Sequence, residues 1–119
     1  MEISKVHDIS VLHLFGEISF MELERIEQVI GSLQRSHNKK IILDFASVDH
    51  IHYRVIKNLV CQAQNLRVEN GDLKIVGANN QTRQILKFTG ADQYLDDYAT
   101  ISEGILSFLQ LKCDTGYLQ

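Results

Sequence analysis

The sequence contains no proline in 119 residues and only two cysteines. Because proline is absent, and no internal repeat or low-complexity segment occurs, nothing in the chain reads as a linker. Cys61 and Cys113 form no CxxC or other metal-binding spacing. The chain is long enough to bury one hydrophobic core without disulfide bonds or a structural metal, so we expect a single domain.

Long apolar runs and clusters of one charge are also missing. No segment approaches the roughly 18 apolar residues of a membrane span, and residues 1–10 lack the basic start and apolar core of a signal peptide. The 12 basic and 15 acidic residues give a formal charge of −3, and no basic cluster exceeds Lys39-Lys40. This predicts a cytoplasmic protein with no membrane insertion and no nucleic-acid surface.

Signatures of catalysis are lacking as well, since no GxSxG, HExxH or phosphate loop occurs. Cys61 falls in the apolar pattern of a helix, which predicts a small buried side chain rather than a nucleophile. His50 and His52 form an H-x-H pair, but zinc needs further ligands, and only Asp44 and Asp49 are near. The pair is otherwise two histidines at an exposed strand end. We expect no enzyme, no cofactor and no metal site.

The apolar pattern that is present alternates between strand and helix periods. A hairpin is predicted from residues 2–7 and from a strand that starts at Ile9 and turns at Gly16. Continuous apolar runs at 40–45 and 72–77 predict buried strands, and residues 93–98 predict a weak edge strand. Helical spacing predicts four helices, at 20–33, 55–66, 79–88 and 100–109.

The order of these elements predicts an α/β fold. Strands and helices that alternate along a chain form parallel strands joined by right-handed crossovers. We therefore expect a small mixed, mostly parallel sheet of about five strands with four helices. Ser19 and Glu22 form a capping box at the first helix, and Asn70-Gly71 ends the second.

The junction at residues 49–58 carries unusual residues for the start of a helix. Such places usually hold Gly, Ser, Thr or Asp, because the helix N–H groups there are unpaired. Here the sequence has His50, His52, Tyr53 and Arg54. A cation at a helix N-terminus costs roughly 0.3–1 kcal/mol, so we expect Arg54 either to face solvent or to meet an anionic partner. Tyr and Arg are both enriched at binding hot spots.

Four stretches resemble, in order and spacing, the STAS domain of bacterial anti-sigma-factor antagonists. The similarity covers the chain from Ile3 to about Leu111, which implies a STAS domain at 1–111 and a tail at 112–119. The matching stretches are VLHLFGEIS at 11–19, KIILDFASVDHI at 40–51, NGDLKIVGANN at 70–80 and ILKFTGADQYL at 85–95.

The resemblance also implies an altered switch. The family signature, Asp-Ser-Ser-Gly or Asp-Ser/Thr-x-Gly, falls on residues 52–55, where the antagonists carry a serine that their anti-sigma kinase phosphorylates. Phosphorylation adds about −1.5 to −2 charges at that helix start. Arg54 occupies the serine position, and no Ser or Thr lies between Val48 and Val68. The phosphoacceptor is therefore expected to be missing.

From the resemblance we expect a non-enzymatic regulator that binds a protein partner, a kinase-type anti-sigma factor or a related signalling protein, without a phosphorylation switch. The alternative is a scaffold or accessory subunit of a stressosome-like assembly or a lipid-transport complex, and self-association is left open. A third class, a small-ligand sensor, needs a pocket at the junction. The partner surface is expected to contain His50, His52, Tyr53, Arg54 and Lys57, flanked by the turn at 16–20 and the loop at 79–80.

Overall fold

Five strands form one sheet in the order β1-β2-β3-β4-β5, with β1 antiparallel to β2 and the other neighbours parallel. The computed structural model describes residues 1–117, with side chains up to Leu109. The α/β fold with a small, mostly parallel sheet and four helices is confirmed. The elements are β1 (Glu2–Val6), β2 (Ile9–Ile18), α1 (Phe20–Arg35), β3 (Lys40–Ile51), α2 (Tyr53–Val68), β4 (Asp72–Val76), α3 (Asn80–Phe88), a short 3-10 helix η1 (Ala91–Gln93), β5 (Asp97–Tyr98) and α4 (Ile101–Tyr117).

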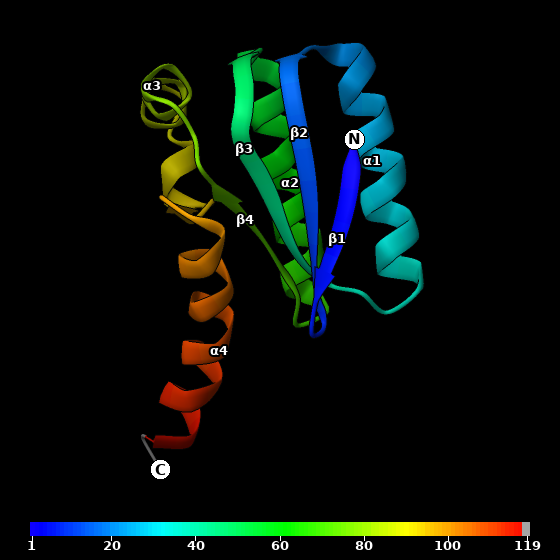
Figure 1. The fold of residues 1–119 in the computed structure, drawn as a ribbon, viewed down its shortest axis with the longest axis vertical. Coiled ribbons are helices and arrows are strands. Elements are labelled where there is room, and N and C mark those ends of the chain that lie inside the picture. Colours follow the sequence, from blue (N-terminus) through cyan, green and yellow to red (C-terminus); the bar gives the residue numbers. More distant parts are fainter. Residues whose placement is uncertain (118–119) are drawn as a thin grey trace.

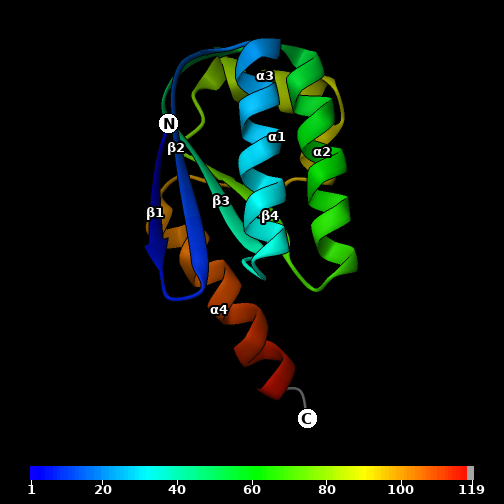
Figure 2. The ribbon, with the colours of Figure 1, turned by 90° about the vertical axis from the view of Figure 1, so that its right-hand side faces the viewer.

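Helices cover the two faces of the sheet unequally. α1 and α2 lie side by side on one face, and α4 crosses the other (Figure 1). Figure 2 looks onto the face covered by α1 and α2, with α4 behind the sheet and projecting below it. The sheet is therefore the middle layer of three, and its α4 face is only partly covered.

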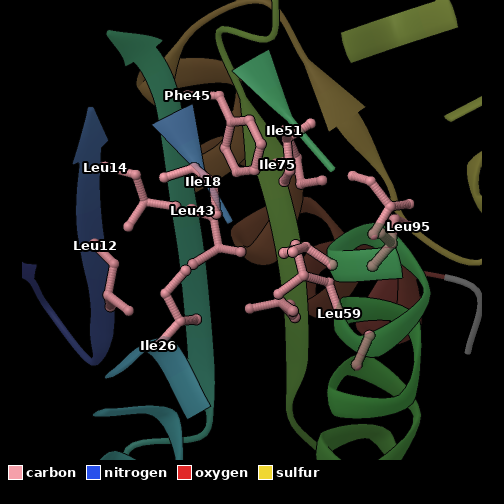
Figure 3. Packing of buried hydrophobic residues seen from close by; sticks show 14 of the residues in the cluster. Leu12, Leu14, Ile18, Ile26, Leu43, Phe45, Ile51, Leu59, Ile75 and Leu95 are labelled. Carbon is pink, nitrogen blue, oxygen red and sulfur yellow. The ribbon is translucent and has the colours of Figure 1, made fainter. Parts of the chain in front are cut away.

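Residues of β3 point alternately into two cores. Ile41 and Leu43 belong to the larger cluster, between the sheet and α1, α2 and α3, whereas Ile42 belongs to a smaller cluster under α4. All three side chains are fully buried, as the apolar run in the sequence predicts. Figure 3 shows part of the larger cluster. The smaller one consists of Ile9, Val11, Ile42, Val76 and Phe108.

Local capping agrees with the sequence. The Glu22 carboxylate accepts hydrogen bonds from the Ser19 backbone N–H (3.2 Å) and hydroxyl (2.5 Å), and these bonds lower the pKa of Glu22. At the end of α2, Asn70 adopts the left-handed conformation with φ 67°, and the Gly71 N–H donates to Leu66 O. A Cβ on Gly71 would collide with the Lys39 carbonyl oxygen, so only glycine fits there.

Three element boundaries were predicted wrongly. β2 does not turn at Gly16 but continues to Ile18. Its pairing with β3 shifts register on either side of residues 15–16, and the positive φ of Gly16 lets the strand pass through this irregularity. β3 extends past residue 45 to Ile51, so the predicted junction is shorter than expected. β5 is only two residues long, since η1 occupies part of the predicted edge strand.

α4 is also longer than predicted, because it continues to Tyr117 instead of ending near residue 109. No proline interrupts the backbone there. The prediction of a buried Cys61 is wrong, since its side chain is exposed. Leu59 and Ala63 form part of the buried stripe of α2, and a residue two positions after Leu59 points to the opposite side of a helix. Cys113 lies beyond the described side chains.

Candidate functional site

The carboxyl ends of the parallel strands meet at one edge of the sheet, and α1, α2 and α3 all begin there. The sequence predicted that the segments at 16–20, 50–57 and 79–80 would lie together at such an edge. The structure joins the segments at 16–20 and 50–57 through His52, and it holds the 79–80 loop against Val48 and Asp49, just before the second segment. This edge therefore gathers three helix N-termini, whose backbone N–H groups lack partners within their helices.

His52 connects two of these segments. Its backbone N–H donates to Ile18 O at 3.2 Å, and its Nδ1 accepts a hydrogen bond from the Arg54 N–H at 3.2 Å. His52 thus serves as the N-cap of α2, a place usually taken by Ser, Thr, Asp or Asn. The acceptor role requires an unprotonated Nδ1, so the capping histidine carries its hydrogen on Nε2.

Three aromatic rings lie in a row over the start of α2. The His52 ring stacks on Tyr53, with centroids 4.8 Å apart, and meets the Phe20 ring of α1 at 5.0 Å. Phe20 and Tyr53 are each about half exposed, with relative exposures of 50% and 46%. Offset and tilted ring pairs of this kind hold their side chains in place, which presents a rigid apolar surface to solvent.

Arg54 follows this aromatic row and is exposed. Its guanidinium carbon lies 6.0 Å from the centroid of the Tyr53 ring. It forms no ion pair with any described residue, and the first turn of α2 contains no acidic residue. The macrodipole adds further positive potential at this end of the helix. The start of α2 is therefore a positively charged surface without a counter-ion among the described side chains.

Asn79 holds the loop before α3 against the end of β3. Its side-chain Nδ2 donates to the backbone oxygens of Val48 (3.2 Å) and Asp49 (3.3 Å), and its Oδ1 caps α3 by accepting from the Thr82 N–H. One side chain thus fixes both the helix start and the neighbouring strand. This fixes the spacing between the starts of α2 and α3.

A groove of about 770 Å³ lies between α2 and α3. Phe88 stands at its side with 94% of its surface exposed, and Lys57 contributes a cation from α2. Large exposed aromatic residues beside a groove mark interaction surfaces more often than isolated exposed residues do. The groove is lined by Tyr53, Lys57, Gln81, Gln84, Ile85, Phe88 and Thr89.

The structure brings together only some of the predicted site residues. His52, Tyr53, Arg54 and Lys57 cluster at the start of α2, whereas His50 is exposed in β3 and its side chain forms no hydrogen bond, ion pair or ring contact with a described residue. Among the described side chains, no three His, Cys, Asp or Glu groups are placed to hold a metal ion. Within that same part of the chain, no helix is long and apolar enough to cross a bilayer.

Sequence reasoning missed Phe88 and placed Phe20 only at the end of the flanking turn at 16–20. Phe88 lies two positions after buried Leu86, so its helical position alone predicts exposure. Phe20 lies at the first position of α1, outside the apolar stripe. Their approach to the start of α2 depends on tertiary packing, which no local pattern records.

Comparison with known proteins agrees with this architecture. The STAS domain family model matches residues 1–104, and the chain belongs to the STAS domain family. No curated protein matches the chain in sequence.

Solved structures share the fold at low sequence identity. One is a Thermotoga maritima protein assigned as an anti-sigma factor antagonist, at 20% identity and a TM-score of 0.82 over 89% of this chain and 92% of that one. Another is an anti-sigma factor antagonist from Mycobacterium paratuberculosis, at 23% identity and 0.79 over 89% and 90%. A third belongs to the stressosome, a signal integration and transduction hub, at 14% identity and 0.72 over 93% and 98%.

Proposed function

We propose that this STAS domain is a non-enzymatic regulator that binds a protein partner, a kinase-type anti-sigma factor or a related signalling protein, in the cytoplasm. The observation that carries the proposal is the start of α2, where exposed Tyr53 lines the groove between α2 and α3 and exposed Arg54 places its guanidinium carbon 6.0 Å from the centroid of the Tyr53 ring. A rigid aromatic anchor, a cation and an apolar groove are the features of binding hot spots. The similarity to anti-sigma factor antagonists supports a partner that is an anti-sigma factor or a related signalling protein.

The proposed regulator does not switch by phosphorylation of this helix start. Arg54 stands where the family's antagonists carry serine, and residues 49–67 contain no Ser or Thr. A phosphoserine would bring about −1.5 to −2 charges, whereas Arg54 brings a permanent positive charge. The surface is therefore held in one charge state, and the amount of partner or of this chain would set the degree of binding.

The charge of the surface indicates the chemistry of the partner. Lys57 lines the groove. Arg54 directly follows Tyr53, and Lys87 directly precedes Phe88, and both of these neighbours line the groove. None of these three cations forms an ion pair with a described residue. A partner that places acidic side chains around an apolar anchor would match this pattern, and charge complementarity raises the association rate as well as specificity. His50 lies at the margin of this surface, so we expect it to contribute less than His52.

Partner capture from the native cells tests the proposal. Tagged wild-type protein is compared with a Tyr53→Ala, Arg54→Asp double variant, and bound proteins are identified by mass spectrometry. Arg35→Asp serves as the control, because Arg35 is exposed at the far end of α1 and undergoes the same charge reversal. We expect a signalling protein that is captured by the wild type and by Arg35→Asp but lost with the double variant.

The opposite pattern would overturn the proposal. If all three proteins capture only copies of themselves, or a transport complex in equal amounts, the start of α2 is not the partner surface. A scaffold or accessory subunit, of a stressosome-like assembly or of a lipid-transport complex, would then describe the protein better.

A further inference from the structure

Three polar side chains from three strands form a chain of hydrogen bonds on the sheet face that α4 partly covers. The Ser4 Oγ of β1 lies 2.8 Å from the His13 Nε2 of β2, and the His13 Nδ1 lies 2.8 Å from the Asp44 Oδ2 of β3. We call these residues the triad. They lie away from the proposed partner surface. Because they come from separate strands, no sequence motif identifies them.

The chemistry of the three groups fixes the direction of each hydrogen bond. An ionised carboxylate can only accept, so the His13 Nδ1 carries a hydrogen and donates it to Asp44. The neutral imidazole then has a free lone pair on Nε2, which accepts the hydrogen of the Ser4 hydroxyl. This is the arrangement in which a histidine acts as general base toward a serine while a carboxylate holds its tautomer and orientation.

The base and the carboxylate are held firmly. The second oxygen of Asp44, Oδ1, accepts the Ala46 backbone N–H at 3.0 Å, so both carboxylate oxygens are engaged. His13 and Asp44 are paired in register across β2 and β3. The side chains are 29% and 15% exposed, which leaves His13 reachable from solvent and Asp44 mostly shielded. A base oriented by rigid strands suits proton transfer better than one on a loop.

A hollow of about 380 Å³ is lined by His13 and Asp44 of the triad but not by Ser4, and its volume is within the size range of small-ligand sites. Phe15 offers an apolar surface there, since its side chain is 62% exposed. Glu2 and Asp44 make the hollow negative, which disfavours an anionic ligand. The lining residues are Glu2, His13, Leu14, Phe15, Asp44 and Ser47.

β1 can also supply donors for the oxygen of a reacting carbonyl. It is the outermost strand of the sheet, and no described strand pairs with its outer edge. Alternate backbone N–H groups of an edge strand point away from its partner and are available to a ligand. Donors at such positions can stabilise the oxyanion that forms when a serine attacks an ester.

We propose that Ser4 is an activated nucleophile, with His13 as its general base and Asp44 as the residue that positions His13, and that this site accepts an acyl group from a small, uncharged ester with an apolar part. The site is separate from the proposed partner surface, and activity there would replace only the non-enzymatic part of the proposed function, because partner binding at the start of α2 needs no chemistry.

The step balances without an added oxidant or cofactor. As the Ser4 oxygen bonds to the carbonyl carbon of the ester, its proton passes to the His13 Nε2. The bond between that carbon and the ester's alkoxy oxygen then breaks, and the alcohol leaves with the proton from His13. Water attacks the acyl-serine in the same way, giving the carboxylic acid and restoring the Ser4 hydroxyl.

Covalent labelling with an uncharged alkyl fluorophosphonate tests the proposal directly. In that reaction the Ser4 oxygen bonds to phosphorus, fluoride leaves, and the serine proton passes to His13. Intact-mass and peptide mass spectrometry give the labelled residue and the rate, and hydrolysis of 4-nitrophenyl butyrate gives a second readout. We expect one label, on Ser4, that is lost with Ser4→Ala. The rate should fall by a factor of about 100 or more with His13→Gln and with Asp44→Asn.

Ser32→Ala is the matched control, because Ser32 is an exposed serine on α1, on the other side of the sheet. It should label at the wild-type rate. Circular dichroism of each variant establishes that it is folded, and Ser4→Ala and His13→Gln suffice if Asp44→Asn unfolds. Wild-type protein that is unlabelled at Ser4, or that labels equally fast with His13→Gln, would overturn the proposal and leave the triad as a hydrogen-bonded cross-strand contact.

Discussion

The two faces of the sheet are built on different principles. The face under α1 and α2 carries the larger apolar cluster of the protein. The opposite face carries a small apolar cluster under α4 together with buried Lys74 and the partly open triad. One face therefore holds most of the apolar packing, and the other holds a buried charge and a chain of hydrogen-bonded polar side chains.

Lys74 shows how far the second face departs from ordinary packing. Its side chain is 1% exposed, and its Nζ donates to the Ser107 Oγ of α4 at 2.8 Å. The same nitrogen lies 4.3 Å from the centroid of the Phe108 ring and 3.9 Å from the Asp96 carboxylate. Cation–π and ion-pair contacts offset part of the cost of burying the charge. α4 is thus attached to the sheet through a polar contact as well as an apolar one.

Adjacent residues of β3 allow the two faces to be compared by the same substitution. Ile41 and Ile42 are both fully buried, the first against α1 and α2 and the second against α4. Each change to Ala should cost about 2–5 kcal/mol in the free energy of unfolding, with the larger value for Ile41→Ala. A single helix such as α4 can settle into the space left at Ile42, whereas the larger core cannot collapse as easily. Urea denaturation measures both values.

Hydrogen exchange sharpens that comparison. With Ile42→Ala, amides of α4 should exchange faster while those of α1 and α2 stay protected, because only the α4 contact is weakened. With Ile41→Ala, protection should fall across the whole sheet. Equal losses of protection in both variants would show that the two faces unfold as one unit and that α4 is no weaker than the rest.

The next largest effect is expected where α4 approaches the sheet most closely. A Cβ on Gly104 would lie 2.8 Å from the Val76 Cγ1 and 3.2 Å from the Ile42 Cδ1. Gly104→Ala should therefore destabilise the protein by about 1–3 kcal/mol through overpacking, less the roughly 1 kcal/mol that alanine contributes to a helix. Thermal denaturation checks the sign. Gly31→Ala on α1 is the control, since its Cβ would meet only the flexible end of Arg35 at 3.3 Å.

The sequence predicted these two faces to different degrees. Apolar periodicity identified the stripes of α1 and α2 and the buried run at residues 41–43, because each depends on the residue's own element. It missed the extension of β3 to Ile51, since polar and apolar residues there no longer alternate regularly beside the register shifts. Apolar periodicity could not predict the triad, because Ser4, His13 and Asp44 meet only through strand pairing.

The candidate site was likewise predicted only in part from the sequence. The resemblance predicted an altered switch at residues 52–55, since that motif is local. The groove was not predicted, because it exists only where α2 and α3 pack with Phe88 exposed beside Tyr53. Likewise, His52 as a helix cap contradicts the usual preference for short polar side chains, so propensity alone did not identify its role.

The smallest expected effect concerns the pH dependence of Lys74. Burial lowers the pKa of Lys74 from its usual 10.5, with Asp96 opposing the shift. Between the folded and the unfolded pKa, the unfolded chain binds the extra proton, so stability should rise with pH through that window. Below it, the cost of the buried charge is fully present. Lys74→Met should remove this dependence and be neutral or slightly stabilising at pH 7.

Parallel urea titrations of the wild type and Lys74→Met from about pH 7 to pH 10.5 measure this difference. The wild type should gain stability relative to the variant as pH rises, because the other titrating groups are shared by both proteins. If the wild type instead loses stability relative to Lys74→Met, the charged form of Lys74 is favoured by folding. The contacts to Ser107, Phe108 and Asp96 would then outweigh its burial.

The most direct test of the central claim, binding through the start of α2, is hydrogen exchange of the whole chain with and without the protein that it captures. We expect added protection at residues 52–60 and 80–89, with little change in β1 and α4. Arg54→Asp should abolish that protection, and Arg35→Asp should leave it intact. Protection confined to β1 or α4, and unaffected by Arg54→Asp, would contradict the claim and place the partner on the other face of the sheet.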